Sequence, residues 1–133
     1  MIEEGLPRTD HQQRADADPS RVREAMAARG VDVAGRKVVL FAPTWRGESF
    51  HDPLVNAAQL VATVRDLRKA LDPKTHVVLL KVHQSVYRAV EERLEGKGFL
   101  VPNDLPTNEL LAVTDLLVTD YSSIVFDHLL SGR

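Results

Sequence analysis

Cations, hydroxyls and an imidazole follow four short apolar segments of this sequence. The four polar groups are Pro43-Thr44-Trp45-Arg46, Lys81-Val82-His83, Asn103-Asp104 and Asp120-Tyr121-Ser122-Ser123. In open parallel sheets, ligands bind outside the carboxyl ends of the strands. If the apolar segments are neighbouring parallel strands, the four groups share one rim, and this rim carries the hydrogen-bond donors that an anionic ligand needs.

Ser122 and Ser123 stand where an apolar segment turns directly into a helical pattern. Backbone N–H groups at a helix start have no acceptor within the helix, and together with the positive end of the helix dipole they favour an anion. The two hydroxyls add donors, so the pair indicates a phosphate site without a glycine-rich loop. The alternative is that one serine only caps the helix. The sequence leaves both interpretations open.

His83 also has two interpretations. An imidazole exchanges a proton near neutral pH, so at a strand end after Lys81 it can donate a proton or a hydrogen bond to a leaving phosphate. A purely structural role is the alternative. Arg46 is either a ligand-binding cation or a solvated loop residue, and Trp45 either packs or stacks on a base.

Composition excludes several classes of function. The 133 residues carry 17 Lys and Arg against 19 Asp and Glu, and this net charge of -2 provides no broad basic field for nucleic acid. There is no cysteine, and the 5 histidines lack metal-ligand spacing, so we expect no metal site. Asp16-Ala17-Asp18 spells D-x-D but precedes a helix cap rather than following a strand, so we discount it as a metal motif. Nucleotide-binding glycine motifs and the G-x-S-x-G motif are absent.

The elements that must position these residues alternate along the chain. Strands are expected at 37–42, 76–82, 99–101 and 116–119, and helices at 21–29, 54–71, 85–94, 107–113 and 122–132. The strands are apolar throughout, which indicates burial on both faces and hence a parallel sheet with helices on both faces. The sequence therefore predicts an α/β, Rossmann-like domain.

The domain is expected to occupy residues 20–133, after a polar and irregular leader at 1–19. The pattern ends where another strand is due, and the opening is irregular, so we expect a fragment that is truncated at both ends. The first residues lack the apolar core of a signal peptide, and no run approaches the roughly 20 apolar residues that span a bilayer. Any membrane contact is expected to be peripheral or to come from other parts of the protein.

Five motifs in order resemble those of a known enzyme family. They are Gly5-Leu-Pro-Arg-Thr-Asp10, Leu40-Phe-Ala-Pro-Thr-Trp-Arg46, Leu80-Lys-Val-His83, Asn108-Glu-Leu-Leu-Ala-Val-Thr-Asp115 and Thr119-Asp-Tyr-Ser-Ser-Ile-Val-Phe-Asp127. Together they resemble the CDP-glycerol glycerophosphotransferase family of teichoic-acid primases and polymerases. The resemblance spans nearly the whole chain, and the last motif combined with A-P-T-W-R is the specific part.

The resemblance implies a GT-B-like transferase with two Rossmann-like domains, of which this chain is most of the donor-binding one. The implied reaction passes glycerol phosphate from CDP-glycerol to a lipid-linked acceptor and releases CMP. The implied donor site is lined by Arg8, Pro43, Thr44, Arg46, Lys81, Val82, His83, Ser122, Ser123 and Asp127. Within it, His83 and the two serines stabilise the leaving phosphate, and Asp127 binds ribose hydroxyls. No cofactor other than the substrate CDP-glycerol is implied.

The sequence departs from the family pattern at Thr9, at Gly47-Glu48 and at Gln84. These departures leave the alcohol open, so a GT-B transferase that uses CDP-ribitol or a nucleotide sugar is the alternative enzyme. A non-catalytic nucleotide-binding module is the alternative from another class. The resemblance further implies a location on the cytoplasmic face of the membrane, and a separate amino-terminal domain that carries the acceptor site and a histidine base.

Overall fold

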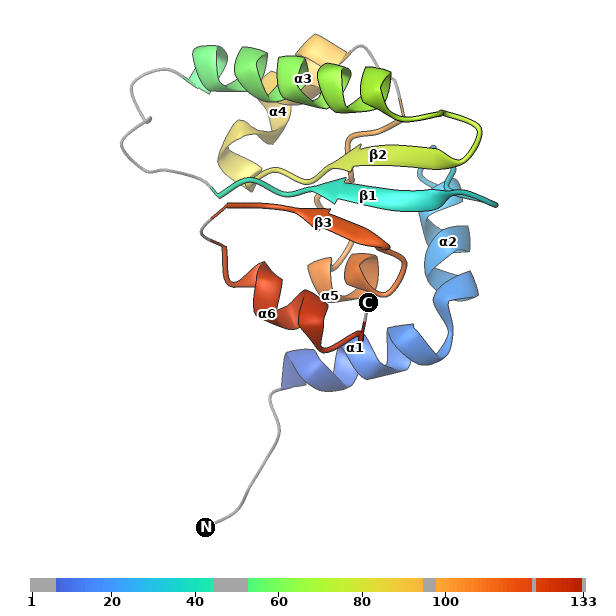
Figure 1. The fold of residues 1–133 in the computed structure, drawn as a ribbon. Helices are drawn as coiled ribbons and strands as arrows, with labels where there is room; N and C mark the ends of the chain where they lie inside the picture. Colours follow the sequence, from blue (N-terminus) through green and yellow to red (C-terminus); the bar gives the residue numbers. More distant parts are fainter. Residues whose placement is uncertain (1–6, 45–52, 95–97, 121, 133) are drawn as a thin grey trace.

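The computed structural model describes residues 7–44, 53–94, 98–120 and 122–132, with only the backbone described for 7–9 and 53–56. The helices are α1 (Pro7–Ala17), α2 (Pro19–Ala27), α3 (Pro53–Ala70), α4 (Gln84–Leu94), α5 (Thr107–Leu111) and α6 (Ile124–Leu129), and the strands are β1 (Lys37–Phe41), β2 (His76–Leu80) and β3 (Leu116–Val118). Figure 1 shows their arrangement around one sheet.

The sheet is parallel, with the strand order β2-β1-β3. The segment expected as a strand at 99–101 is reduced to a single parallel bridge between Leu80 and Leu100. Two hydrogen bonds hold it: the Leu80 N–H donates to the Phe99 oxygen at 2.8 Å, and the Val101 N–H donates to the Leu80 oxygen at 2.9 Å. With this segment outside β2, the spatial order follows the first half of a Rossmann sheet.

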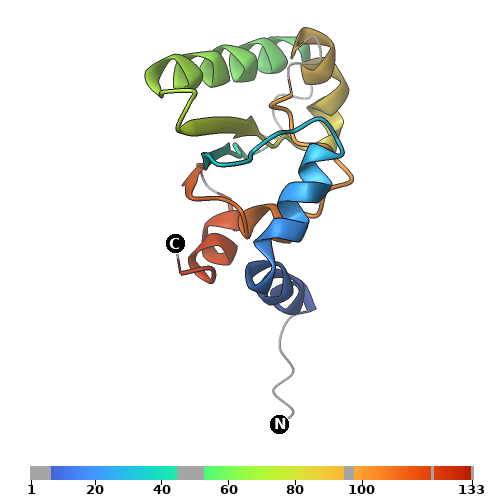
Figure 2. The same ribbon diagram turned by 90° about the vertical axis from the view of Figure 1, so that its right-hand side faces the viewer.

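Helices cover both faces of the sheet, as the apolar strands require. Helices α3 and α4 lie on one face, and α1, α5 and α6 lie on the other (Figure 1). Helix α2 runs beside the amino ends of the strands, which the turned view also shows (Figure 2). Positions such as Val38, Leu40 and Leu79 are fully buried between the layers. The α/β, Rossmann-like fold expected from the sequence is confirmed.

The expectation of an irregular leader is wrong for residues 7–17, which form α1. This helix has almost no apolar stripe, because its buried positions are Gln12 and Ala15. A helix with so few apolar positions gives no periodicity to read. Elsewhere the differences are at element ends: the helix expected at 122–132 covers 124–129, and the helix expected at 107–113 ends at Leu111. Residues 45–52 and Tyr121 lie outside the described residues.

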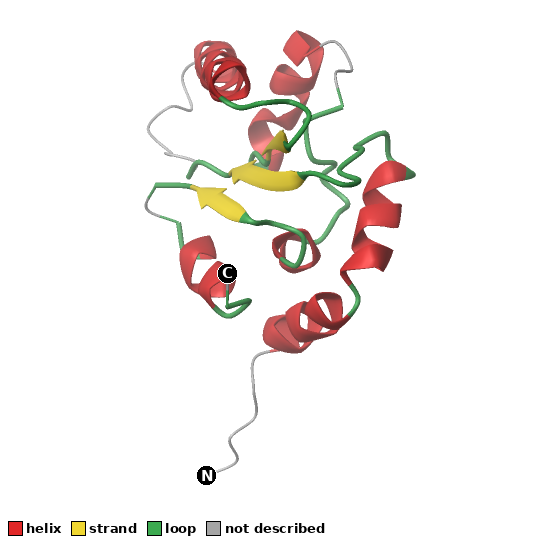
Figure 3. Ribbon diagram, turned by 45° about the vertical axis from the view of Figure 1, so that its right-hand side comes forward, coloured by secondary structure: helices red, strands yellow, loops and turns green. Residues whose placement is uncertain are grey.

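The helices of the described segments contain no stretch that is both long and apolar enough to cross a membrane. The division of the chain into a leader at 1–19 and a domain at 20–133 stays a prediction. Within the structure, α1 packs on α5 and reaches α6 through side-chain hydrogen bonds. Figure 3 shows that α2 follows α1 and runs beside the sheet, whereas α1 lies farther from the strands, next to α5.

Candidate functional site

A hollow of ≈ 640 Å³ lies outside the carboxyl ends of the three strands. We call it the carboxyl-edge hollow. Its lining residues follow β1, β2 and β3 or begin the helices next to them: Ala42, Pro43, Thr44, Lys81, Val82, His83, Gln84, Asn103, Thr107, Asn108, Ser122, Ser123, Ile124 and Asp127. The chain leaves β1 toward α3 on one face and leaves β3 toward α6 on the other, so the hollow opens at the point where ligands bind in such sheets (Figure 1).

Eight of the residues predicted from the sequence meet in this hollow. They are Pro43, Thr44, Lys81, Val82, His83, Ser122, Ser123 and Asp127. Arg8 lies on α1, but its side chain is outside the described residues, as are Trp45 and Arg46. The structure thus brings together the predicted residues whose side chains it describes. Their binding of a ligand stays a prediction.

The segments after β1 and β3 are joined by three hydrogen bonds. The Thr44 N–H donates to Asp120 Oδ1 at 2.6 Å, and the Thr119 hydroxyl donates to the Ala42 oxygen at 2.6 Å. The Ala42 N–H donates to the Val118 oxygen at 2.9 Å. Bonds between groups so far apart in sequence fix the position of this side of the hollow. Sequence analysis assigned no role to Thr119, because it lies within the expected strand.

The Thr44 hydroxyl is buried and has no hydrogen-bond partner among the described residues. A buried hydroxyl without a partner costs about 1–3 kcal/mol. Thr44 lines the carboxyl-edge hollow. A ligand that recovers part of this cost must reach the hydroxyl, whose oxygen has almost no exposed surface.

The two serines differ in their local bonding. Ser123 is the residue before α6, yet its side chain makes no capping hydrogen bond. The Ser122 hydroxyl accepts a long hydrogen bond, 3.4 Å, from the Ile124 N–H. A capping role thus applies weakly to Ser122 and does not apply to Ser123. The Ser123 hydroxyl is exposed at the hollow, where it can donate to a ligand.

Of the two roles that the sequence left open for His83, the structure shows the structural one. Its Nδ1 accepts the Ser85 N–H at 3.3 Å and lies 2.8 Å from the Ser85 hydroxyl, so the imidazole caps the start of α4. An Nδ1 that accepts a backbone N–H carries no proton itself, which assigns the ring proton of the neutral imidazole to Nε2. The ring is exposed and lines the hollow, and its Nε2–H is a donor for an anionic ligand.

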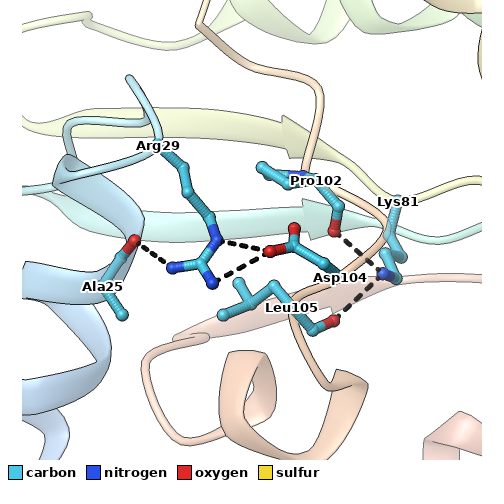
Figure 4. Close-up of polar contacts among 6 residues, drawn as sticks. All are labelled: Ala25, Arg29, Lys81, Pro102, Asp104 and Leu105. Atoms are coloured by element: carbon cyan, nitrogen blue, oxygen red, sulfur yellow. Dashed lines mark hydrogen bonds and ion pairs between the residues drawn. The ribbon is translucent and has the colours of Figure 1, made fainter.

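Lys81 holds the loop at 102–105 from the side of β2 (Figure 4). Its ammonium donates to the oxygens of Pro102 at 3.4 Å and Leu105 at 3.3 Å. Burial lowers the pKa of Lys81, and the charge of Asp104 opposes this shift in part. Asn103 belongs to the same loop and lines the hollow. Lys81 therefore positions a wall of the hollow and also contributes a positive charge there.

Arg29 holds the same loop from the other side (Figure 4). Its Nε donates to Asp104 Oδ2 at 2.9 Å, and its Nη2 lies 2.9 Å from the same oxygen. Its Nη1 donates to the Ala25 oxygen at 2.9 Å, which fixes the guanidinium at the end of α2. Asp104 was expected on the rim, but it does not line the hollow. It anchors the loop that presents Asn103.

Gln12 does not line the hollow, but it forms hydrogen bonds to two residues that do. It was not found by sequence analysis. Its side chain is 1% exposed. Its Nε2 donates to the Asp127 backbone oxygen and to the Ser131 hydroxyl at 2.7 Å, and its Oε1 accepts from Asn108 Nδ2 at 3.3 Å. Asn108 and Asp127 both line the hollow. One buried amide thus ties α1 to the start of α5 and to the carboxyl-terminal part of α6.

Among the residues that the structure describes, no three histidine or carboxylate side chains come together as a group that could hold a metal ion. The carboxyl-edge hollow has one lysine and one aspartate in its described lining, and its remaining polar groups are neutral amides, hydroxyls and an imidazole. This set suits a ligand that is recognised by directed hydrogen bonds to phosphate and hydroxyl groups.

The comparisons with known proteins identify the family of this chain. The family model described as CDP-Glycerol:Poly(glycerophosphate) glycerophosphotransferase matches residues 1–133. The chain therefore belongs to the CDP-glycerol:poly(glycerophosphate) glycerophosphotransferase family, as its motifs indicated.

Individual relatives come from teichoic-acid synthesis. A teichoic acid poly(glycerol phosphate) polymerase of Bacillus spizizenii is 30% identical over 96% of this chain and 32% of its own length. A teichoic acid poly(ribitol-phosphate) polymerase of the same organism is 33% identical over 100% of this chain and 21% of its own length. Among solved structures, a variant of the wall teichoic acid polymerase TagF soaked with CDPG matches with a TM-score of 0.66 and 28% identity, over 99% of this chain and 32% of that one. The chain thus spans a third or less of the length of these relatives.

Proposed function

We propose that this chain forms the donor-binding part of a transferase that moves glycerol phosphate from CDP-glycerol to a lipid-linked poly(glycerophosphate) acceptor and releases CMP. The observation that carries the proposal is the carboxyl-edge hollow, in which the exposed side chains of His83 and Ser123 present donors at the ligand-binding edge of a Rossmann-like sheet. Membership of the glycerophosphotransferase family supports the same reaction.

The lining residues divide between the parts of the donor. The hydroxyls of Ser122 and Ser123 and the Nε2–H of His83 bind the diphosphate, because they are hydrogen-bond donors in the lining of the hollow. The carboxylate of Asp127, on the first turn of α6, accepts hydrogen bonds from the ribose hydroxyls. Lys81 adds positive charge and keeps the loop at 102–105 in place. Arg8 and Arg46 complete the phosphate-binding set in the proposal.

The reaction is a displacement at the phosphorus that bears the glycerol. The oxygen of the acceptor hydroxyl forms the new P–O bond, and the P–O bond to CMP breaks with its electron pair going to the CMP phosphate. Donors that are already in place stabilise this growing charge, and each such donor can contribute roughly 10²–10³-fold to the rate. His83, Ser122 and Ser123 act in this way. The proposal assigns no metal ion or cofactor to the site, and it leaves the base that takes the acceptor proton outside this chain.

The proposed location is the cytoplasmic face of the membrane, where the chain acts peripherally. The acceptor is lipid-linked, and the nucleotide donor is water-soluble, so the reaction belongs at that interface. The contact with the membrane is assigned to parts of the protein other than the described helices.

CDP-ribitol is the second candidate donor. A ribitol-phosphate polymerase is among the relatives at 33% identity, so family membership supports both alcohols. The two donors share the CDP group and differ in the alcohol. The described lining residues would make the same contacts to the diphosphate and the ribose of either donor.

Calorimetric titration of the 133-residue chain tests the proposal. We expect CMP and CDP-glycerol to bind, and UDP-glucose to bind at least about tenfold more weakly. CDP-ribitol binding more tightly than CDP-glycerol would transfer the proposal to the ribitol donor. Saturable binding of neither CDP-alcohol nor CMP at millimolar concentration would reject it.

A further inference from the structure

A second hollow lies at the opposite end of the sheet, and nothing in the proposed reaction uses it. It measures ≈ 630 Å³ and is lined by Arg23, Gly35, Arg36, Lys37, Lys74, Thr75, His76 and Asp115. We call it the amino-edge hollow, because Lys37 and His76 begin β1 and β2. It is nearly as large as the carboxyl-edge hollow.

The framework of the amino-edge hollow is fixed by the sheet. The Lys37 N–H donates to the Thr75 oxygen at 2.9 Å, which joins the start of β1 to the turn before β2. The Val38 N–H donates to Asp115 Oδ2 at 2.7 Å, and the Asp115 N–H donates to the Val38 oxygen at 2.9 Å. These bonds fix the start of β1, where Lys37 lies, relative to the turn before β2, which carries Lys74.

The charge of this hollow differs from that of the whole chain. Four cations line it, Arg23, Arg36, Lys37 and Lys74, against the single carboxylate of Asp115, whereas the chain has a net charge of -2. Cations gathered in a concave surface raise the local positive potential more than the same charges on a flat face. Anions are therefore attracted to this edge of an otherwise acidic protein.

Two of the four cations are already engaged. Arg23 Nη1 donates to the Val33 oxygen at 3.0 Å, and Arg36 lies 3.8 Å from Asp32 Oδ2. By contrast, the exposed ammonium groups of Lys37 and Lys74 have no hydrogen-bond or ion-pair partner among the described residues. These two lysines come from separate elements and face the same hollow, so they are the groups that an anionic ligand would meet.

We propose that the amino-edge hollow binds the phosphate groups of a poly(alditol phosphate) chain, with Lys37 and Lys74 as the main contacts. This inference rests on the proposed function, whose product is a chain with one negative charge per repeat. The hollow lies at the other end of the strands from the donor site, so the polymer and the nucleotide bind without competing. A concave site lined by four cations fits a flexible chain better than the plane of a bilayer.

The test measures binding of a fluorescent synthetic glycerol phosphate oligomer to the full chain by anisotropy. In the double variant Lys37→Gln/Lys74→Gln, we expect the oligomer affinity to fall at least about tenfold, because two charge-assisted contacts are lost. CMP affinity should change by less than about twofold, because the carboxyl-edge hollow is untouched. The double variant Lys37→Arg/Lys74→Arg should keep oligomer binding, and added salt should weaken it by screening.

Lys69→Gln is the matched control, because Lys69 is an exposed lysine on α3 that does not line the hollow. Equal oligomer affinity in this control and in Lys37→Gln/Lys74→Gln would overturn the proposal. A second result would also overturn it: binding to phosphatidylglycerol vesicles that depends on the two lysines, with no binding of the oligomer. The hollow would then be assigned to a membrane surface. If the unaltered chain does not bind CMP, the proposed donor site is rejected instead. Failure of the polymer site and failure of the donor site are therefore distinguishable.

Discussion

The two hollows have almost the same volume, ≈ 640 and ≈ 630 Å³, but they recognise ligands by different physical means. The carboxyl-edge hollow is lined mainly by hydrogen-bond donors and acceptors that other hydrogen bonds hold in place, such as His83 and Asn108. The amino-edge hollow is lined by four cations and one carboxylate. Directed hydrogen bonds distinguish one ligand from its close analogues, whereas a cluster of charges attracts any suitable anion and weakens in salt. Specificity is therefore expected at one edge and general polyanion binding at the other.

The largest effect should come from removing the buried support of the carboxyl-edge hollow. Gln12→Ala removes the hydrogen bonds that join its side-chain amide to Asn108, to the Ser131 hydroxyl and to the Asp127 backbone oxygen. We expect the free energy of unfolding to fall by about 1–3 kcal/mol in denaturant titration. CMP affinity should fall as well, while oligomer binding at the amino edge persists in the folded protein.

Gln13→Ala is the control for this change, because Gln13 is the exposed neighbour on the same helix. Its stability should stay within about 0.5 kcal/mol of the unaltered chain. If both variants lost the same stability, the cost would come from α1 as a whole and not from the buried amide.

The next effect concerns the two serines. Ser122→Ala/Ser123→Ala should weaken CMP and CDP-glycerol binding at least about tenfold, or roughly 1.4 kcal/mol, because two hydroxyl donors to phosphate are lost. The fold should survive, since Ser123 makes no capping bond and the Ser122 bond is long. Calorimetry measures the ligand affinity, and a thermal melt measures the stability of the fold. Unchanged CMP affinity would remove the serines from the site, and Ser20→Ala on α2 serves as the control.

His83 offers a way to separate the structural role from the binding role. In His83→Asn, the side-chain oxygen can still accept the Ser85 N–H, so α4 should keep its cap. In His83→Ala, the cap is lost, and we expect about 1 kcal/mol of destabilisation. Both variants lose the Nε2–H, and both should weaken CDP-glycerol binding to a similar extent. Full binding by His83→Asn would leave His83 with the capping role alone.

The smallest effect is expected for Arg29→Ala. The ion pair with Asp104 is exposed at the surface, and pairs of this kind contribute about 0.2–1 kcal/mol. We expect a loss of stability within this range and a weakening of CMP binding of about twofold, because the loop that presents Asn103 keeps its bonds to Lys81. Arg65→Ala on α3 is the control. A large loss of CMP affinity would show that Arg29, more than Lys81, sets the position of the loop.

The sequence by itself determined the α/β class, the parallel sheet and most of the lining of the carboxyl-edge hollow. Uninterrupted apolar strands indicate burial on both faces, as β1 and β2 show, and the carboxyl ends of parallel strands meet at one edge. Residues that directly follow β1, β2 and β3, such as Thr44, Lys81 and Ser123, were therefore found from their positions alone. The motifs added the family, which the comparison over residues 1–133 confirmed.

Only the tertiary structure decided which polar groups support others. Gln12 is buried in a helix without an apolar stripe, and its three partners lie about a hundred residues away. Asp104 lies on the predicted rim but turns to Arg29 instead of the hollow. The amino-edge hollow combines cations from α2, β1 and the turn before β2, which no local pattern joins. Periodicity and motifs report local burial and local chemistry, whereas these pairings depend on which distant segments the folded chain brings into contact.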